Sequence, residues 1–265
     1  MRTSPNQSSF TIQLRVISAL MIREVRLRNK KHAFSQLFDL MEAVVFIVAH
    51  FIIFKFLGRH LLIGDSLLLF ITTGIFPILF FRTISIRAAS AMESAKSVTV
   101  IPLVEALDFA ISRALVEFIS YGLIFIAFFA MISVLELSRY AIPFNVVAIV
   151  QFTILILLFS FGLGLVNSYL IYMFPLWKFI WGGISRTQIF MSGVFFIPEY
   201  MPPVIKNILS YNPLLHFVAL FRTGFYSTYP THMLSMNYIL QWTFGVLIIG
   251  LSAERMLRNQ RALHA

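Results

Sequence analysis

The chain contains six long runs of apolar residues in which charged residues are few. The runs span 37–57, 66–86, 107–135, 144–174, 176–197 and 234–252. Each is long enough for a membrane-crossing helix, because a hydrocarbon core about 30 Å thick needs about 20 helical residues. Strands do not fit, since the runs lack period-two alternation and a lipid-exposed backbone must satisfy its own hydrogen bonds. The pattern predicts an all-α polytopic membrane protein with six transmembrane helices.

The segment before the first run, residues 9–31, has apolar residues at steps of three or four. These residues form one stripe on a helix: Phe10, Leu14, Ile17, Met21 and Val25. Arg and Lys occupy the other faces, so the helix is too polar to cross a bilayer. The pattern predicts an N-terminal amphipathic interface helix, which is either a membrane-surface anchor or a docking helix for a cytoplasmic partner. Glu24 favours docking, because an acidic residue does not suit a face that binds anionic lipid.

Two connections between the runs carry their own patterns. Residues 92–101 form either a simple connector or a short transverse helix held by a soluble subunit. Residues 197–234 contain five prolines around apolar pieces that are too short to cross a bilayer. Asn212 and Pro213 are typical of a helix N-cap and first turn. We expect a re-entrant periplasmic helical hairpin at about 198–230 before the last span, with a loose apolar loop packed on the bundle as the alternative.

The composition agrees with a membrane protein and excludes a soluble globular one. Of the 265 residues, 59% are hydrophobic and only 12% are charged, about half the charged fraction of average soluble proteins. The formal net charge is +10, and sixteen of the 21 Lys and Arg residues fall in alternate connections and the two terminal segments. Because Lys and Arg are retained on the cytoplasmic side, both termini are predicted to be cytoplasmic. We expect no nucleic acid partner.

Sequence motifs for chemistry are missing. The sequence has no zinc motif H-E-x-x-H, no nucleophile motif G-x-S-x-G and no phosphate-binding loop. The string Gly64-Asp65-Ser66-Leu67 matches one hydrolase family, but the D-x-x-H partner of that family is absent, so the string is interpreted as a turn. We expect no catalytic, cofactor-binding or metal-binding residues, and any ATP-driven role would need a motor from another subunit.

Three segments together resemble the permease subunits of ABC type 2 exporters. They are Arg23-Glu24-Val25-Arg26-Leu27-Arg28, Ser192-Gly193-Val194-Phe195-Phe196 and Tyr211-Asn212-Pro213-Leu214-Leu215-His216. Over residues 10–258 the chain is similar to the capsular polysaccharide export permeases of Gram-negative bacteria, the KpsM-like branch. The resemblance implies a cytoplasmic N-terminus (1–36), an ABC type 2 transmembrane domain (37–258) and a cytoplasmic tail (259–265). It also implies a multi-pass protein of the bacterial inner membrane that exports lipid-linked capsular polysaccharide from the cytoplasm.

The same resemblance implies several partners. Two copies of the chain would form a homodimer with a channel at its two-fold interface, docked on two copies of a nucleotide-binding ATPase subunit. ATP and Mg would be bound by that ATPase, and no cofactor by this chain. A periplasmic co-polymerase-type adaptor and an outer-membrane channel would continue the path of the lipid-linked anionic polysaccharide. The expected ATPase-docking residues are Arg23, Glu24, Arg28, Glu93 and Lys96.

Residues for the substrate channel follow from the chemistry of the cargo, since sugars stack on aromatic rings and a polyanion is attracted by cations. The expected substrate-channel residues are Phe76, Phe80, Arg82, Arg87, Trp177, Lys178, Trp181, Tyr200, Tyr211, His216, Phe217, Phe221 and Arg222. Ordinary cytoplasmic retention explains the cations at the inner mouth equally well. The family pattern has an acidic residue where this chain has Ala219, so Arg222 is expected to meet either Glu199 or a sugar carboxylate.

Two other functions are compatible with part of these patterns. The same architecture could export O-antigen, teichoic acid or another lipid-linked cargo. A more distant alternative is a secondary transporter without an ATPase partner. That class shows inverted repeats with charged or broken helices near the bilayer midplane, and the sequence has no such repeat.

Overall fold

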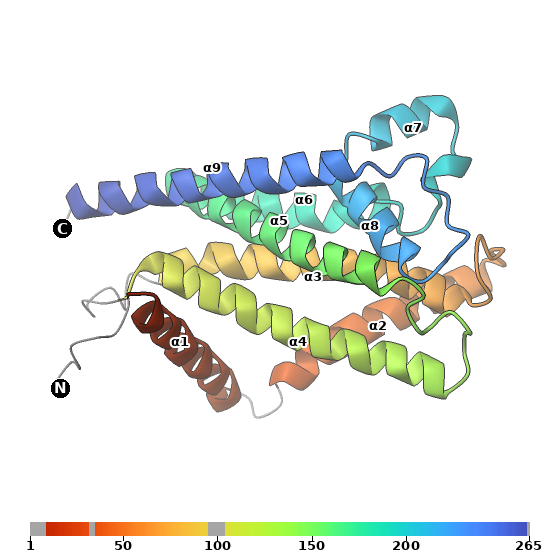
Figure 1. The fold of residues 1–265 in the computed structure, drawn as a ribbon, viewed down its shortest axis with the longest axis horizontal. Helices are drawn as coiled ribbons and strands as arrows, with labels where there is room; N and C mark the ends of the chain where they lie inside the picture. Colours follow the sequence, from red (N-terminus) through yellow and green to blue (C-terminus); the bar gives the residue numbers. More distant parts are fainter. Residues whose placement is uncertain (1–8, 32–34, 95–103, 264–265) are drawn as a thin grey trace.

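The computed structural model describes residues 9–31, 35–94 and 104–263, and within these ranges the fold is all-helical (Figure 1). The helices in the described residues are α1 (Ser9–Lys31), α2 (Ser35–Phe56), α3 (Leu67–Ser94), α4 (Ala106–Val134), α5 (Val146–Met173), α6 (Trp177–Met191), the 3₁₀ helix η2 (Pro198–Tyr200), α7 (Pro203–Leu209), α8 (Pro213–Thr223) and α9 (Met236–Leu263). A helix therefore occupies each of the six predicted runs. The last helix passes through the predicted boundary between domain and tail at 258.

Four of the described helices are long and apolar enough to cross a membrane: α3, α4, α5 and α9. Helices α7 and α8 satisfy the same criteria only as a pair bent by 98°, which is either a broken span or a re-entrant loop. The apolar part of α2, Ala43–Phe56, is shorter, and α6 has 15 residues, about 22 Å of helix. The predicted number of six spans is not confirmed.

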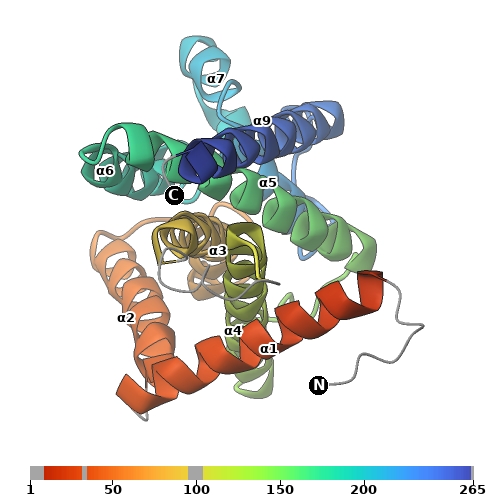
Figure 2. The same cartoon turned by 90° about the vertical axis from the view of Figure 1, so that its left-hand side faces the viewer.

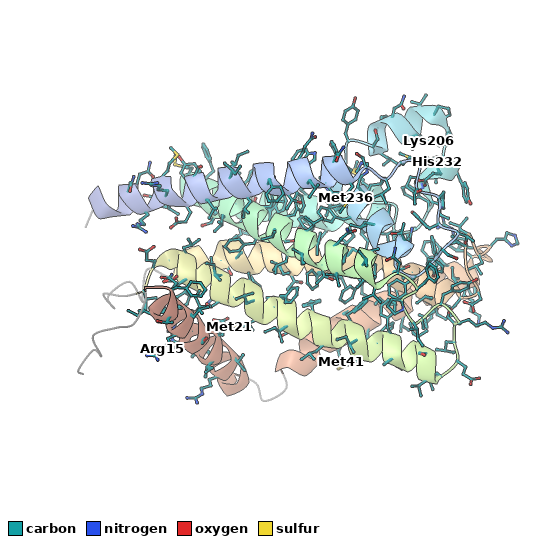
Figure 3. The ribbon with its side chains drawn as sticks, viewed as in Figure 1. Arg15, Met21, Met41, Lys206, His232 and Met236 are labelled. Atoms are coloured by element: carbon teal, nitrogen blue, oxygen red, sulfur yellow. The ribbon has the colours of Figure 1, made fainter. Side chains whose placement is uncertain are left out.

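Helix α3 runs through the middle of the bundle. Helices α2, α4, α5, α6 and α8 all contact it, and α9 packs along α5 (Figure 2). Helix α1 and the C-terminal end of α9 lie at one end of the bundle, here called the near end, whereas α7 and the loops around it lie at the other, the far end (Figure 1). Arg15 and Lys206 mark these two ends (Figure 3).

The central position of α3 follows from its sequence. Every residue from Leu69 to Phe81 is buried, as expected for a helix that is apolar on all sides and enclosed by others. Gly74 permits a close approach, because a Cβ atom there would lie 2.7 Å from the carbonyl oxygen of Val194. The loop that follows α6 can therefore pack directly on the backbone of α3.

The proline-rich segment forms the two predicted short helices, α7 and α8. The Asn212 side chain accepts a hydrogen bond from the backbone N–H of Leu214 (3.1 Å), and Pro213 occupies the first turn of α8. Residues 214–222 of α8 are all buried, so this part is a tightly packed helix and the loose-loop alternative does not describe it. Re-entry of the segment into a membrane stays a prediction.

Helix α1 has the predicted bounds, but its contacts differ from the predicted stripe. Leu20 is buried together with Phe109 of α4, with Val16 packed against them. Phe10 and Leu14 of the predicted stripe are 70% and 47% exposed. The buried contact is therefore made by Leu20 of the neighbouring i, i+4 row, whereas Ile17, Met21 and Val25 of the stripe are half-buried. Of the 92–101 connection, residues 92–94 extend α3, and the remainder lies outside the described residues.

Candidate functional site

Charged and polar side chains at the near end join α1 to the membrane helices. The Arg113 side chain of α4 donates from Nε to Glu24 Oε2 of α1 at 3.1 Å, and the two side chains are only 17% and 12% exposed. Arg113 Nη1 also donates to Ser90 Oγ of α3 at 3.3 Å. One turn away on α4, Asp108 accepts a hydrogen bond from the Gln13 side chain of α1. Helix α1 is thus attached to α4 at two positions.

Two further ion pairs extend this set across the near end. Arg87 of α3 pairs with Glu117 of α4 at 3.0 Å, and the Glu117 side chain is fully buried. Arg258 of α9 pairs with Glu105, the N-cap residue of α4. These contacts, together with those of Arg113 and Asp108, are called the near-end network. The network connects α1, α3, α4 and α9. Glu117, Glu24 and Arg113 are largely removed from water and would be costly to leave unpaired, whereas the exposed pair of Arg258 and Glu105 contributes little.

Two of the predicted docking residues, Glu24 and Arg23, contact α4. The Glu24 carboxylate faces the bundle and binds Arg113, so it is directed inward. The guanidinium of Arg23 lies 5.3 Å from the ring centroid of Phe109. The side chains of Arg28 and Glu93, and the whole of Lys96, lie outside the described residues.

Arg222 forms a second polar centre near the far end, in the last turn of α8. The side chain is fully buried, and its Nη1 atom donates to the Gly193 carbonyl at 2.7 Å. Its Nη2 atom donates to the carbonyls of Val194 (2.6 Å) and Phe70 (3.2 Å). The guanidinium also stacks on the Phe70 ring, 4.0 Å from the centroid. One cation thus holds the loop after α6 against α3.

Neither expected partner of Arg222 is present in this arrangement. Glu199 accepts a hydrogen bond from the Met233 backbone N–H (3.2 Å) instead, and Ala219 is buried one turn earlier in α8. Because Arg222 is fully buried, a sugar carboxylate cannot reach it in this conformation. Among the described residues, backbone carbonyls take the place of the acidic partner expected for Arg222.

His216 has a structural position beside this centre. Its Nδ1 accepts from the Ser235 backbone N–H at 3.2 Å, which places the ring proton on Nε2. Nε2 then donates to the Ser210 carbonyl at 2.9 Å. The neutral imidazole therefore ties the α7–α8 turn to the segment that leads into α9.

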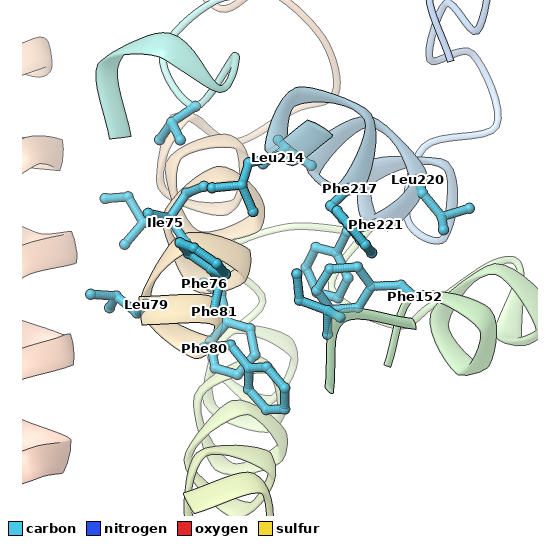
Figure 4. Close-up of a cluster of buried hydrophobic side chains, with 14 of the residues drawn as sticks. Ile75, Phe76, Leu79, Phe80, Phe81, Phe152, Leu214, Phe217, Leu220 and Phe221 are labelled. Carbon is cyan, nitrogen blue, oxygen red and sulfur yellow. The ribbon is translucent and has the colours of Figure 1, made fainter. Parts of the chain in front are cut away.

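The predicted channel phenylalanines are core residues in this structure. Phe76, Phe80, Phe217 and Phe221 are at most 5% exposed. Phe221 of α8 lies between Phe76 of α3 and Phe152 of α5, with centroid separations of 6.2 and 4.5 Å (Figure 4). Such aromatic contacts hold α8 against its neighbours.

The other predicted channel residues lie in separate places. Trp177 Nε1 of α6 donates to Asn167 Oδ1 of α5 at 2.8 Å, and Trp181 packs edge-on against Phe81 of α3. Lys178 is exposed, and Arg82 is partly buried. The exposed rings belong to the far end: Tyr200 is 65% and Tyr211 is 76% exposed. The thirteen residues do not converge on one site within the described part of the protomer.

The Gly64-Asp65 string is a turn at the far end, as predicted. Gly64 has φ = +78°, in the region that favours glycine. Asp65 accepts hydrogen bonds from Ser138 Oγ and the Arg139 backbone N–H (2.8 Å) of the α4–α5 connection. Desolvation raises the pKa of Asp65, but these hydrogen bonds and the nearby Arg139 outweigh it, so the pKa lies below its usual value. The carboxylate joins two loops.

Comparison with known proteins identifies similar chains along nearly the whole length. A polysialic acid transport protein, KpsM of Escherichia coli, is 27% identical over 249 residues, which cover 94% of this chain and 96% of the relative. The capsule polysaccharide export inner-membrane protein CtrC of Neisseria meningitidis is 25% identical, covering 92% and 91%. BexB of Haemophilus influenzae, which has the same description, is 24% identical and covers 92% of both chains. No protein-family model matches the chain.

Proposed function

We propose that this chain, a homologue of capsule polysaccharide export inner-membrane proteins, is the inner-membrane permease subunit of a capsule polysaccharide exporter. The observation that carries the proposal is the colinear similarity to KpsM, which covers 94% of this chain and 96% of the relative. A similarity of that extent leaves only a small part of either chain unmatched. The long apolar helices α3, α4, α5 and α9 are consistent with a multi-pass protein.

The energy for export comes, in this proposal, from a separate ATPase. The sequence has no phosphate-binding loop, and in the proposed assembly two copies of the chain form a homodimer on two nucleotide-binding subunits. The near end is the proposed docking side. The near-end network supports this because a push on α1 would be transmitted to α4 through Glu24 and Arg113, and to α3 through Ser90.

The proposed cargo is a lipid-linked anionic polysaccharide. Lys178 and Arg186 lie on α6 with exposed side chains, and cations at a pore mouth raise the local concentration of a polyanion. At the far end, Tyr200 and Tyr211 offer exposed rings on which sugars can stack. An adaptor and an outer-membrane channel would take up the polymer there. O-antigen or teichoic acid is the alternative cargo for the same architecture.

The first experiment is deletion of the gene for this chain in the bacterium that makes it. We expect surface capsule to disappear while polysaccharide accumulates inside the cell, and both effects to be reversed by the gene in trans. If surface capsule is unchanged and a different surface glycan is lost, that glycan would be the cargo instead of capsule. Unchanged levels of all surface glycans would contradict the export function.

A second experiment tests the ATPase partner and the docking side. The tagged chain, purified in mild detergent, should retain a nucleotide-binding subunit at equal stoichiometry. Arg26→Glu reverses one exposed cation of α1 and should weaken that association, whereas Lys206→Glu, in α7 at the far end, is the matched control. Equal retention by both variants would exclude α1 from the docking surface.

A further inference from the structure

An apolar hollow opens on the side of the bundle at the far end of α4. It has a volume of about 390 Å³. Its walls come from the end of α4, the following connection and the segment after α8: Phe125, Ile126, Phe129, Ala130, Ser133, Val134, Ala141, Ile142, Pro143 and Phe225. Only Ser133 among these residues carries a polar side chain. The hollow, here called the α4 hollow, is separate from the near-end network and from Arg222.

The rim of the α4 hollow faces outward, on the side of α4 where a membrane span contacts lipid. Ile126, Val134 and Ile142 are 64%, 80% and 69% exposed, although large aliphatic side chains of this kind are disfavoured in water. The hollow occupies residues 125–134 of α4, about 14 Å of helix. That length is about half of a hydrocarbon core, so the hollow opens into a single leaflet.

The floor of the hollow is preformed. Phe129 stacks on Phe225 with ring centroids 4.6 Å apart, and Phe125 contacts Phe129 at 4.3 Å. Phe225 is 1% exposed and follows directly on α8. Because these rings are fixed by the buried cluster around Phe221, the floor cannot move up to fill the space. An occupant must supply the missing contacts.

We propose that the α4 hollow binds one acyl chain of a membrane phospholipid. A sugar does not fit this lining, since its hydroxyl groups would be left without hydrogen-bond partners beside a single serine. Water is disfavoured for the same reason, because a buried water needs several polar partners. A flexible hydrocarbon chain fits, and it is the molecule that surrounds α4 at this depth. The site rests on the membrane position of α4 and does not depend on the cargo of the exporter.

Photo-crosslinking of lipid to the full-length protein tests this site. The purified protein is placed in nanodiscs of phosphatidylethanolamine with a small fraction of lipid that carries a diazirine on one acyl chain, and adducts are mapped by mass spectrometry. We expect adducts to concentrate on residues 125–134 and 141–143. Ala130→Trp, which fills the hollow, should reduce them about tenfold. Ala127→Trp, on an exposed position of the same helix outside the lining, should leave them unchanged.

Three results would overturn the proposal. Adducts spread evenly over all exposed apolar helix surfaces would show an ordinary lipid annulus. Adducts found only in membranes of capsule-producing cells, and not in the nanodiscs, would assign the hollow to the lipid anchor of the cargo. A disulfide between two copies of an Ile142→Cys variant, together with absence of lipid adducts, would show that a second copy covers the hollow. The first and third results leave the proposed export function unaffected.

Discussion

Arg113 and Glu24 are 89 residues apart in sequence and form an ion pair of 3.1 Å with little exposure of either side chain. The pair connects α4 to α1. Because both groups are largely removed from water, loss of one partner leaves the other charge poorly compensated. The position of α1 on the bundle therefore depends on this contact.

We predict that Glu24→Arg destabilises the attachment of α1 by about 1.5–3 kcal/mol, the range for hydrogen bonds to charged groups. The double variant Glu24→Arg/Arg113→Glu restores the pair with reversed charges and should recover most of the loss. Proteolytic release of α1 from purified protein measures the effect. Equal release from the single and double variants would show that the pair does not hold α1.

We predict that Arg222→Met unfolds the far end even though it removes a buried charge. The guanidinium of Arg222 donates hydrogen bonds to the carbonyls of Gly193, Val194 and Phe70. A buried acceptor left without a donor costs about 1–3 kcal/mol. The melting temperature in detergent should fall clearly below that of Arg186→Met, which removes an exposed cation from α6. Similar melting temperatures for the two variants would mean that water takes the place of the guanidinium.

Close packing of α5 on α9 is tested at two glycines. A Cβ atom at Gly162 would lie 2.8 Å from the Leu247 Cα atom, whereas a Cβ atom at Gly245 would meet nothing within 4 Å. Gly162→Ala should therefore destabilise the protein by about 1–3 kcal/mol through overpacking. Gly245→Ala, within α9, should be neutral or stabilising by up to about 1 kcal/mol. Thermal unfolding in detergent compares the two, and the reverse order would refute the close approach.

Asp65 makes the contact between the two far-end loops sensitive to acid. Its pKa is lowered in the folded protein, so its stabilising contribution is complete above the pKa of the unfolded chain and is lost as pH falls through the lower folded value. We expect no change between pH 7 and 5 and loosening only below roughly pH 4, near the ordinary pKa of Asp. Amide hydrogen exchange at residues 138–140 measures it, and Asp65→Asn should remove the dependence. Loosening already at pH 6 would assign the effect to another group.

The sequence predicted local features such as helix bounds, an N-cap and a turn, but it did not predict the partners of buried polar groups. The bounds of α1, the N-cap at Asn212 and the turn at Gly64 follow from nearby residues, and the structure agrees with each. Arg222 could not be placed in the same way, because its acceptors are main-chain carbonyls that have no residue signature. The residues through which α1 contacts α4 were equally unreadable, since Val16 and Leu20 lie beside the apolar stripe and only tertiary packing selects them.

The pairing of distant charges shows the same limit. Arg113 and Glu117 stand at i, i+4 on α4, a spacing that permits a local pair, whereas the ion pairs in the structure join Arg113 to Glu24 and Glu117 to Arg87. Spacing along one helix gives the possible neighbours on that helix only. The partners come from other helices: Glu24 of α1 pairs with Arg113, and Arg87 of α3 pairs with Glu117. No pattern within α4 indicates these pairs.

The shortness of α6 has a consequence for the lipid around the protein. A helix of about 22 Å is several ångströms shorter than an average hydrocarbon core, and bilayers adjust to a short helix by thinning beside it. The cost is a fraction of a kcal/mol for each ångström. In the proposed exporter, a membrane-crossing α6 would thin the bilayer beside its exposed Lys178 and Arg186.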